Sequence, residues 1–493
     1  MLIALVHIPS NPIGVVVVAA VLLLVSRPII ARTTASQAAP WLSRILMASL
    51  VIHLLAAPAQ IYVVDHFYGG IADWLRYDNQ GSQLAPAFRH LDFSLSSAHV
   101  GKIVNNGSVS VVAGGVMALT GVNQVAAFMA FAWMSWLGTI FFYRAFTVTF
   151  PEARDSHRRY AILVFFLPSM IFWTADVSKE AIMMVSLGVA TYGAALVLAR
   201  RPRGFTYLTL GAAMGALIRP NELLLLLAGF AVALMIRPAD RGRTYSGIRR
   251  VAGLAFMLVL LSASLYLTLH YLHSSGGTLS LSQTNQNNNG TGAGFGSSGA
   301  GYSSSPLAFP SDVYTVLFDP TPLNAHSTGA RLASLENLII GVLILASLRR
   351  LRILPRTAFC RPYVMLCTAY TLMFIYAFAA LGNLGLITRE RVLMLPYLLV
   401  LLCIPRAPSG TPPRYPWEVR RKNRRQFEAY QRALALHAAQ LQAAAASAVL
   451  AAGGGTLTTD STAPIEPGPS RMVPAGTDDH AAVEPPTSSD PPG

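Results

Sequence analysis

Acidic and aromatic side chains gather in one short stretch of the sequence, residues 65–90, which follows a long apolar run. Asp73, Tyr77, Gly81 and Leu84 recur there at helical spacing, so a carboxylate, a phenol and a gap for close packing share one face of a short helix. A carboxylate presented at a membrane surface can deprotonate the hydroxyl group of an arriving substrate. We therefore take Asp73 as the leading candidate for a general base and Tyr77 as a candidate substrate contact.

Two further acids of this stretch, Asp65 and Asp78, are reserve candidates for the same role. A second interpretation explains the same residues equally well, namely a solvated surface helix whose acids only keep it soluble. The acidic stretch alone does not decide between the two, and the other charged turns of the chain carry the argument further.

A second candidate lies at WTADVSKEA, residues 173–181, between two apolar runs. Ser178 is a good N-cap, and Glu180 in the first turn complements the helix dipole, so helix capping explains both. Capping does not require Lys179, one of only three lysines in the chain. A lysine beside the free N–H groups of a helix N-terminus is suited to binding phosphate. Lys179 and Glu180 are therefore candidate substrate-binding residues.

Arginines stand in two other short turns, Arg219 in RPNE and Arg389 with Arg391 in RER. For a single arginine, a side chain that reaches from the membrane to the surface is a sufficient explanation. Three arginines at the ends of separate apolar runs favour convergence on an anionic headgroup, because a guanidinium binds phosphate oxygens in pairs. We add all three to the candidate substrate-binding residues.

The elements that must position these residues are apolar helices. Of the 493 residues, 53% are hydrophobic and 12% are charged, about half the charged fraction of a soluble protein. The pattern predicts an all-α polytopic membrane protein with about eleven transmembrane helices and an interfacial helix in the first outer loop. The short apolar run 108–120 favours an interfacial or re-entrant helix. The predicted spans are 13–30, 41–64, 124–148, 160–175, 181–199, 205–218, 223–236, 251–272, 335–348, 362–381 and 392–404.

The distribution of positive charge predicts which side each loop faces. With eleven spans and the N-terminus outside, and with the C-terminal segment counted as far as Arg425, 27 lysines and arginines fall in inner segments and eight in outer ones. Such an excess marks the cytoplasmic side, so the C-terminus is predicted to be cytoplasmic. The same distribution explains the net charge of +15 without any nucleic-acid partner.

The predicted organisation has three parts: a transmembrane domain over 1–404 with a flexible outer loop at 273–334, a basic and Ala-rich cytoplasmic helix over 405–452, and a disordered tail over 453–493. The three cysteines lie within or beside apolar runs, which indicates neither disulfides nor a zinc site. No metal-ligand spacing is present, so no metal-binding residue is assigned. The cofactor is not identified, and dependence on a divalent metal stays open.

Several stretches together resemble a known family. The acidic loop with Asp73 and Tyr77, then FLPSMIFWTADVSKEA, LIRPNE, VLFDPTPLNAHSTGARLASLEN and NLGLITRER, resembles the GT-C type of membrane glycosyltransferase, which uses polyprenyl-phosphate sugars in bacterial cell-envelope glycan synthesis. The resemblance covers roughly residues 40–405. It implies that Asp73 is the catalytic carboxylate of the first outer loop, and that Lys179, Arg219, Arg389 and Arg391 hold the lipid phosphate.

The expected function is transfer of a sugar from a polyprenyl-phosphate donor to an envelope glycan or lipid acceptor, on the outer face of the bacterial inner membrane. A polymerase or ligase of lipid-linked glycans is a second reading. A non-catalytic transporter or flippase of such lipids is a third, which predicts charged residues along a path through the membrane. The expected partners are the lipid-linked sugar, its acceptor and the bilayer.

Overall fold

The computed structural model of this chain describes residues 12–37, 39–67, 73–95, 98, 100, 105–237, scattered positions between 251 and 266, 309–379, 384–405, 428, 431–444 and 446–447. Across these residues the regular elements are helices, with no β-strand, which confirms the predicted all-α class. The chain divides into two compact units, Met1–Arg420 and Arg421–Gly493. In the second unit, residues 431–444 are helical and exposed.

The first unit contains the following helices in chain order. They are α1 (Pro12–Gln37), α2 (Pro40–Phe67), α3 (Trp74–Arg89), α4 (Asn106–Thr120), α5 (Gln124–Thr149), α6 (Arg154–Phe166), α7 (Pro168–Phe172), α8 (Lys179–Leu198), α9 (Gly204–Ile218), α10 (Pro220–Ile236), α13 (Phe309–Phe318), α14 (Thr328–Ala346), α15 (Leu348–Leu351), α16 (Leu354–Cys360), α17 (Pro362–Ala379), α18 (Leu384–Glu390), the 3-10 helix η4 (Arg391–Leu393) and α19 (Leu395–Leu402).

Six of the described helices are long and apolar enough to cross a membrane: α1, α2, α5, α8, α14 and α17. The chain is therefore a multi-pass membrane protein whose apolar helix surfaces suit a lipid bilayer. Three shorter apolar helices, α4, α9 and α10, accompany them. The number of about eleven spans stays a prediction, as do the bacterial inner membrane and the orientation of the termini. Of the predicted flexible outer loop 273–334, residues 273–308 lie outside the described residues, as does the tail from 453, whereas residues 309–318 and 328–334 are helical and correct that part of the prediction.

The centre of the bundle is α5, which is buried along most of its length between α2 and α8. Close packing of α5 on α8 depends on two glycines, because a Cβ at Gly138 would lie 2.4 Å from the carbonyl oxygen of Met184, and one at Gly188 would lie 2.4 Å from that of Gly138. Small residues at helix contacts are the usual means of close approach inside a membrane. This contact holds α8, which carries Lys179 and Glu180 in its first turn, against the centre of the bundle.

Two elements differ from the sequence-based expectation. The predicted span 160–175 is interrupted between α6 and α7, where Leu167 is extended before Pro168. The reason is that proline disfavours helical backbone in the preceding residue and lacks an N–H group. In addition, α2 continues to Phe67, so Asp65 is part of a helix rather than of the first outer loop.

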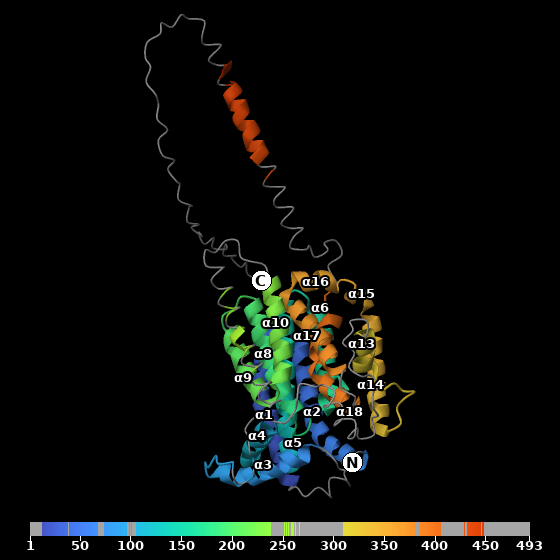
Figure 1. The fold of residues 1–493 in the computed structure, drawn as a ribbon. Coiled ribbons are helices and arrows are strands. Elements are labelled where there is room, and N and C mark those ends of the chain that lie inside the picture. The colour runs from blue at the N-terminus through green and yellow to red at the C-terminus, as the bar shows by residue number, and fades with distance from the viewer. Residues whose placement is uncertain are drawn as a thin grey trace, which may run out of the picture. The chain divides into compact units, whose positions relative to one another are not determined.

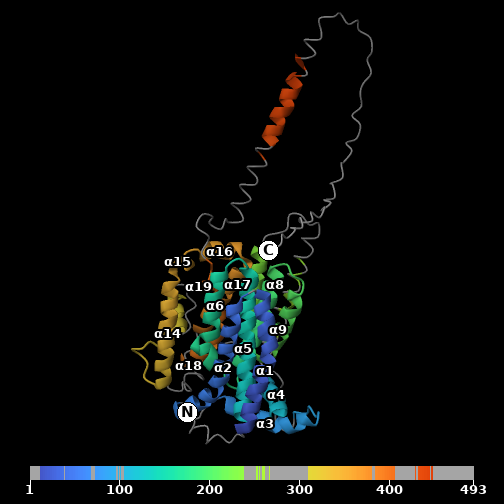
Figure 2. The same cartoon turned by 180° about the vertical axis from the view of Figure 1, so that it is seen from behind.

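The charged turns lie at opposite ends of the bundle. Figures 1 and 2 place α3 and α4 at one end, and α15 and α16 at the other. The elements α15 and α16 contain Arg349, Arg350 and Arg356, which the charge count assigns to an inner loop. The acidic first loop and this basic loop are therefore separated by the length of the bundle.

Candidate functional site

The helix α3 presents the predicted face to α4. Its residues Tyr77, Gly81 and Leu84 are buried, and a Cβ at Gly81 would lie 2.8 Å from the Cβ of Ala113 in α4. The Tyr77 hydroxyl donates a hydrogen bond of 3.0 Å to Asn106 Oδ1. Burial raises the pKa of Tyr77 to about 12, so the phenol keeps its proton. The predicted close approach of another helix at Gly81 is confirmed by its contact with α4.

The Asp73 side chain precedes this helix instead of lying within it. It occupies the N-cap position of α3, yet its carboxylate makes no capping hydrogen bond. Asp73 Oδ2 instead accepts a hydrogen bond of 2.8 Å from Arg389 Nη1. The Asp73 side chain is 68% exposed, whereas that of Arg389 is 18% exposed. Asp73, the leading candidate for a base, is therefore connected to the helix bundle by its ion pair with Arg389 of α18.

The second arginine, Arg219, lies in the turn between α9 and α10, where Pro220 occupies the first helical position of α10. Its Nη2 donates to Glu180 Oε1 at 2.7 Å, and its Nη1 donates to Glu222 Oε1 at 2.7 Å. Glu390, at the end of α18, is its third carboxylate partner. Three buried carboxylates therefore surround one guanidinium that is 12% exposed.

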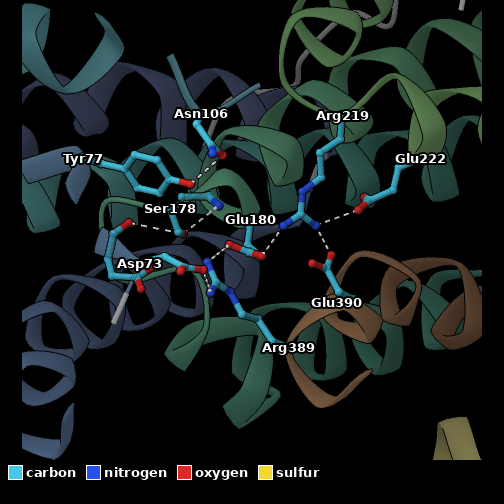
Figure 3. Close-up of polar contacts among 11 residues, drawn as sticks. Asp73, Tyr77, Asn106, Ser178, Glu180, Arg219, Glu222, Arg389 and Glu390 are labelled. Atoms are coloured by element: carbon cyan, nitrogen blue, oxygen red, sulfur yellow. Dashed lines mark hydrogen bonds and ion pairs between the residues drawn. The ribbon is translucent and has the colours of Figure 1, made fainter. Parts of the chain in front are cut away.

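Glu180 joins the two arginines. Its Oε1 pairs with Arg219 and its Oε2 pairs with Arg389 Nη2 at 2.7 Å, while its own side chain is fully buried. Figure 3 shows Asp73 and Glu180 beside the Arg389 guanidinium, with Arg219 between Glu180, Glu222 and Glu390. A buried carboxylate is stable only when it is paired in this way. One ion-pair network thus connects α3, α8, α10 and α18.

The start of helix α4 is hydrogen-bonded to the end of α9, next to Arg219. The Asn105 N–H donates to the Leu217 carbonyl oxygen at 2.7 Å, and the Ser108 hydroxyl donates to the same oxygen at 2.8 Å. Leu217 lies two residues before Arg219, at the end of α9. The turn that carries Arg219 is therefore held against the α3–α4 pair, which also carries Asn106 and Tyr77.

Two titratable groups beside the network, Lys179 and Asp176, make no ion pair with the described residues. Lys179, the first residue of α8, is half-buried and makes no hydrogen bond or ion pair with any described residue. Asp176, in the turn before α8, is buried, and its Oδ1 has no partner among the described residues. Burial raises the pKa of Asp176 to about 6, against the opposing effect of the nearby Arg389. The predicted N-cap is confirmed, since Ser178 Oγ accepts the Ala181 N–H at 3.4 Å.

Three predicted site residues lie outside this network. Asp65 is exposed on α2. Asp78 is half-buried on α3 with Oδ1 unpartnered among the described residues, and burial raises its pKa to about 6. Arg391 is fully buried, and its Nη1 donates to the Leu317 carbonyl oxygen of α13 at 3.4 Å. The structure therefore brings together Asp73, Lys179, Glu180, Arg219 and Arg389, and separates them from the other three.

Sequence reasoning did not include Glu222, Glu390, Asn106 and Asp176 among the site residues. Glu222 and Glu390 each lie in the same short motif as a chosen arginine, RPNE and RER, at the end of an apolar run. The criterion that selected the arginines would therefore have found them too. Asn106 carried no such signal, because its contact with Tyr77 joins residues 29 positions apart.

The described residues hold no group of three or more histidines, cysteines, aspartates and glutamates arranged to bind a metal ion. The three glutamates of the network surround a guanidinium instead. Comparison of the chain with protein-family models, with curated proteins and with solved structures finds no match. The chemistry of the site is therefore inferred from its own residues: an exposed carboxylate, and an ammonium group that makes no ion pair with the described residues, beside a buried ion-pair network.

Proposed function

We propose that the chain is a membrane glycosyltransferase that transfers a sugar from a polyprenyl-phosphate donor to a hydroxyl group of an envelope glycan or lipid acceptor. The observation that carries the proposal is the placement of the exposed carboxylate of Asp73 next to a buried network at one end of an apolar bundle. Lys179, which makes no ion pair with the described residues, lies beside that network. A base and a free cation at a membrane surface suit a reaction in which a hydroxyl loses a proton and a phosphate leaves.

The roles follow from exposure and pairing. Asp73 takes the proton of the acceptor hydroxyl, whose oxygen forms a bond to the anomeric carbon of the donor sugar. The bond between that carbon and the phosphate oxygen breaks, and the leaving polyprenyl phosphate carries the negative charge. Lys179 and the outward edge of Arg389 stabilise this charge. The sequence-based hypothesis gave Arg219 the same task, but its three carboxylate partners suit a structural role better.

The test is sugar transfer in proteoliposomes that contain the full chain, measured with a set of radiolabelled polyprenyl-phosphate sugars. Asp73→Asn should lower turnover about 100- to 10,000-fold while donor binding survives. Lys179→Met should weaken donor binding without removing any ion pair of the described residues. The matched control is Asp92→Asn, an exposed acid just after α3. Near-normal transfer by Asp73→Asn with a donor that the unmodified chain uses contradicts the assignment.

A second candidate, transport of lipid-linked glycans, has one observation in its favour. The network holds four carboxylates, Asp73, Glu180, Glu222 and Glu390, against two guanidiniums. Buried acids in excess of their cationic partners are common in proton-coupled membrane transporters. Movement of a fluorescent lipid-linked sugar across the proteoliposome membrane, with no transfer to any acceptor, would favour this candidate. A polymerase or ligase would instead lengthen or attach the glycan in the same vesicles.

A further inference from the structure

We propose that the Asp73 carboxylate binds Arg389 at the place where the phosphate of the substrate binds. An arriving phosphate then displaces the carboxylate from the guanidinium. The identity of the phosphate as part of a lipid-linked sugar rests on the proposed function, whereas the exchange itself rests on the geometry of the described residues. The exchange regulates the site, because it keeps the base paired until the donor is bound.

The first observation is an asymmetry of exposure within the network. Arg219 pairs only with buried carboxylates, and Arg389 pairs with one buried carboxylate, Glu180, and one that is 68% exposed, Asp73. An exposed pair contributes little stability, whereas a buried carboxylate that loses its partner is costly. The Arg389–Asp73 pair is therefore the contact of this network that a ligand can open with the smallest loss.

The second observation is the position of Asp73 at the N-cap of α3. Aspartate is a preferred N-cap because its carboxylate accepts the N–H groups of the second and third helical residues, here Leu75 and Arg76. In this structure Asp73 stands at the N-cap of α3 but pairs with Arg389 instead. The Asp73 backbone is helical here, with φ −61° and ψ −29°, so a carboxylate released from the arginine would cap α3 once that backbone becomes extended.

The third observation is the charge that receives the incoming anion. Burial, together with the nearby Arg219 guanidinium, lowers the pKa of Lys179 to about 8, so its ammonium group is still mostly protonated at pH 7, and it makes no ion pair with any described residue. A phosphate has more oxygens than the single carboxylate that it would replace, so it can contact Lys179 and Arg389 together. Glu180 would keep the Arg389 guanidinium in place during the exchange.

The test measures binding to the full chain in nanodiscs by thermophoresis, with farnesyl phosphate as the lipid-linked probe and inorganic phosphate as the free one. Asp73→Asn should tighten farnesyl phosphate binding about two- to fivefold, the range that loss of an exposed ion pair allows. Asp92→Asn makes the same change of net charge and should leave binding unchanged. Weaker or unchanged binding by Asp73→Asn would overturn the exchange, and a gain confined to inorganic phosphate would overturn the lipid-linked assignment.

Hydrogen exchange gives a second readout that does not depend on affinity. Farnesyl phosphate should slow exchange at the amides of Leu75 and Arg76 in the unmodified chain, because Asp73 then caps α3, and should not do so in Asp73→Ala, whose side chain cannot accept a hydrogen bond. Unchanged exchange in the unmodified chain would overturn the proposal. Neither readout requires sugar transfer: if Asp73→Asn abolishes transfer but weakens phosphate binding, the proposed function stands and the exchange fails. If transfer is unaffected and binding tightens, the reverse holds.

Discussion

The two arginines of the network differ in one respect that separates structure from function. Arg219 pairs with Glu180, Glu222 and Glu390, which are all buried, and we call these contacts the closed half of the network. Arg389 pairs with the buried Glu180 on one side and with the exposed Asp73 on the other, and we call the contact with Asp73 the open half. Similar guanidinium–carboxylate contacts therefore serve as a fixed joint between helices at Arg219 and as an exchangeable contact at Arg389.

The two halves of the network also hold different helices in place. The closed half joins α8, α10 and α18 through residues at or near the ends of apolar helices. The open half adds α3, which belongs to the first loop and is held separately by its packing on α4. Loss of the closed half should disturb the bundle, whereas loss of the open half should disturb only the chemistry.

The largest expected effect follows from Glu180→Gln, which removes the charge shared by both arginines. Loss of one member of a buried ion pair costs about 3–5 kcal/mol, so the midpoint of thermal unfolding in nanodiscs should fall sharply. The control is Glu152→Gln, which breaks the exposed pair with Arg361 and should cost less than about 1 kcal/mol. Equal shifts in the two variants would remove the distinction between closed and open pairs.

A smaller effect is expected at the contact that holds α3. Gly81→Ala places a Cβ 2.8 Å from that of Ala113, so α3 must shift on α4, at a cost of about 1–3 kcal/mol. Gly115→Ala is the matched control, because a Cβ there meets no atom within 4 Å. Thermal unfolding and donor turnover should both fall in Gly81→Ala, whereas Gly115→Ala should lose neither. An unaffected Gly81→Ala would show that α3 does not depend on this close approach.

The sequence was sufficient for the all-α class, for the six long apolar helices and for the face of α3 that packs on α4, because all three depend on local periodicity. The arginines and Lys179 could also be predicted, since charge at the end of an apolar run has few structural explanations. Their partners could not be predicted, because the Asp73–Arg389 pair joins residues 316 positions apart and the Glu180–Arg389 pair joins residues 209 positions apart. For the same reason Arg391 was grouped with Arg389, although the two side chains contact different elements.

A third prediction concerns Asp176, which is buried beside the network without a partner for Oδ1 among the described residues. Because burial raises its pKa to about 6, above that of an unfolded aspartate, the folded state loses stability as the pH rises from about 4 to 6. Asp176→Asn should therefore raise stability by about 2–3 kcal/mol above pH 6 and change it little below about pH 4. A stability gain that is independent of pH would contradict this origin.

The smallest stability change is expected from Asp73→Asn. The Asp73 side chain is 68% exposed, so the loss of its ion pair should change the free energy of unfolding by less than about 1 kcal/mol. The amide can still accept a hydrogen bond from Arg389. Thermal unfolding of the same nanodisc sample that is used for the transfer assay checks this point. A loss comparable to that of Glu180→Gln would place Asp73 in the closed half of the network.

The most direct test of the open half is labelling of Lys179 from one side of the membrane. Replacing the other two lysines by Lys102→Arg and Lys422→Arg leaves Lys179 as the only lysine side chain. In intact cells, a membrane-impermeant amine reagent should modify Lys179 from outside, and farnesyl phosphate should protect it. The modified residue is identified by peptide mass spectrometry, which separates it from the N-terminal amine. Modification only after the cytoplasmic face is exposed, or modification that farnesyl phosphate does not slow, would contradict an outward-facing phosphate site at Arg389 and Lys179.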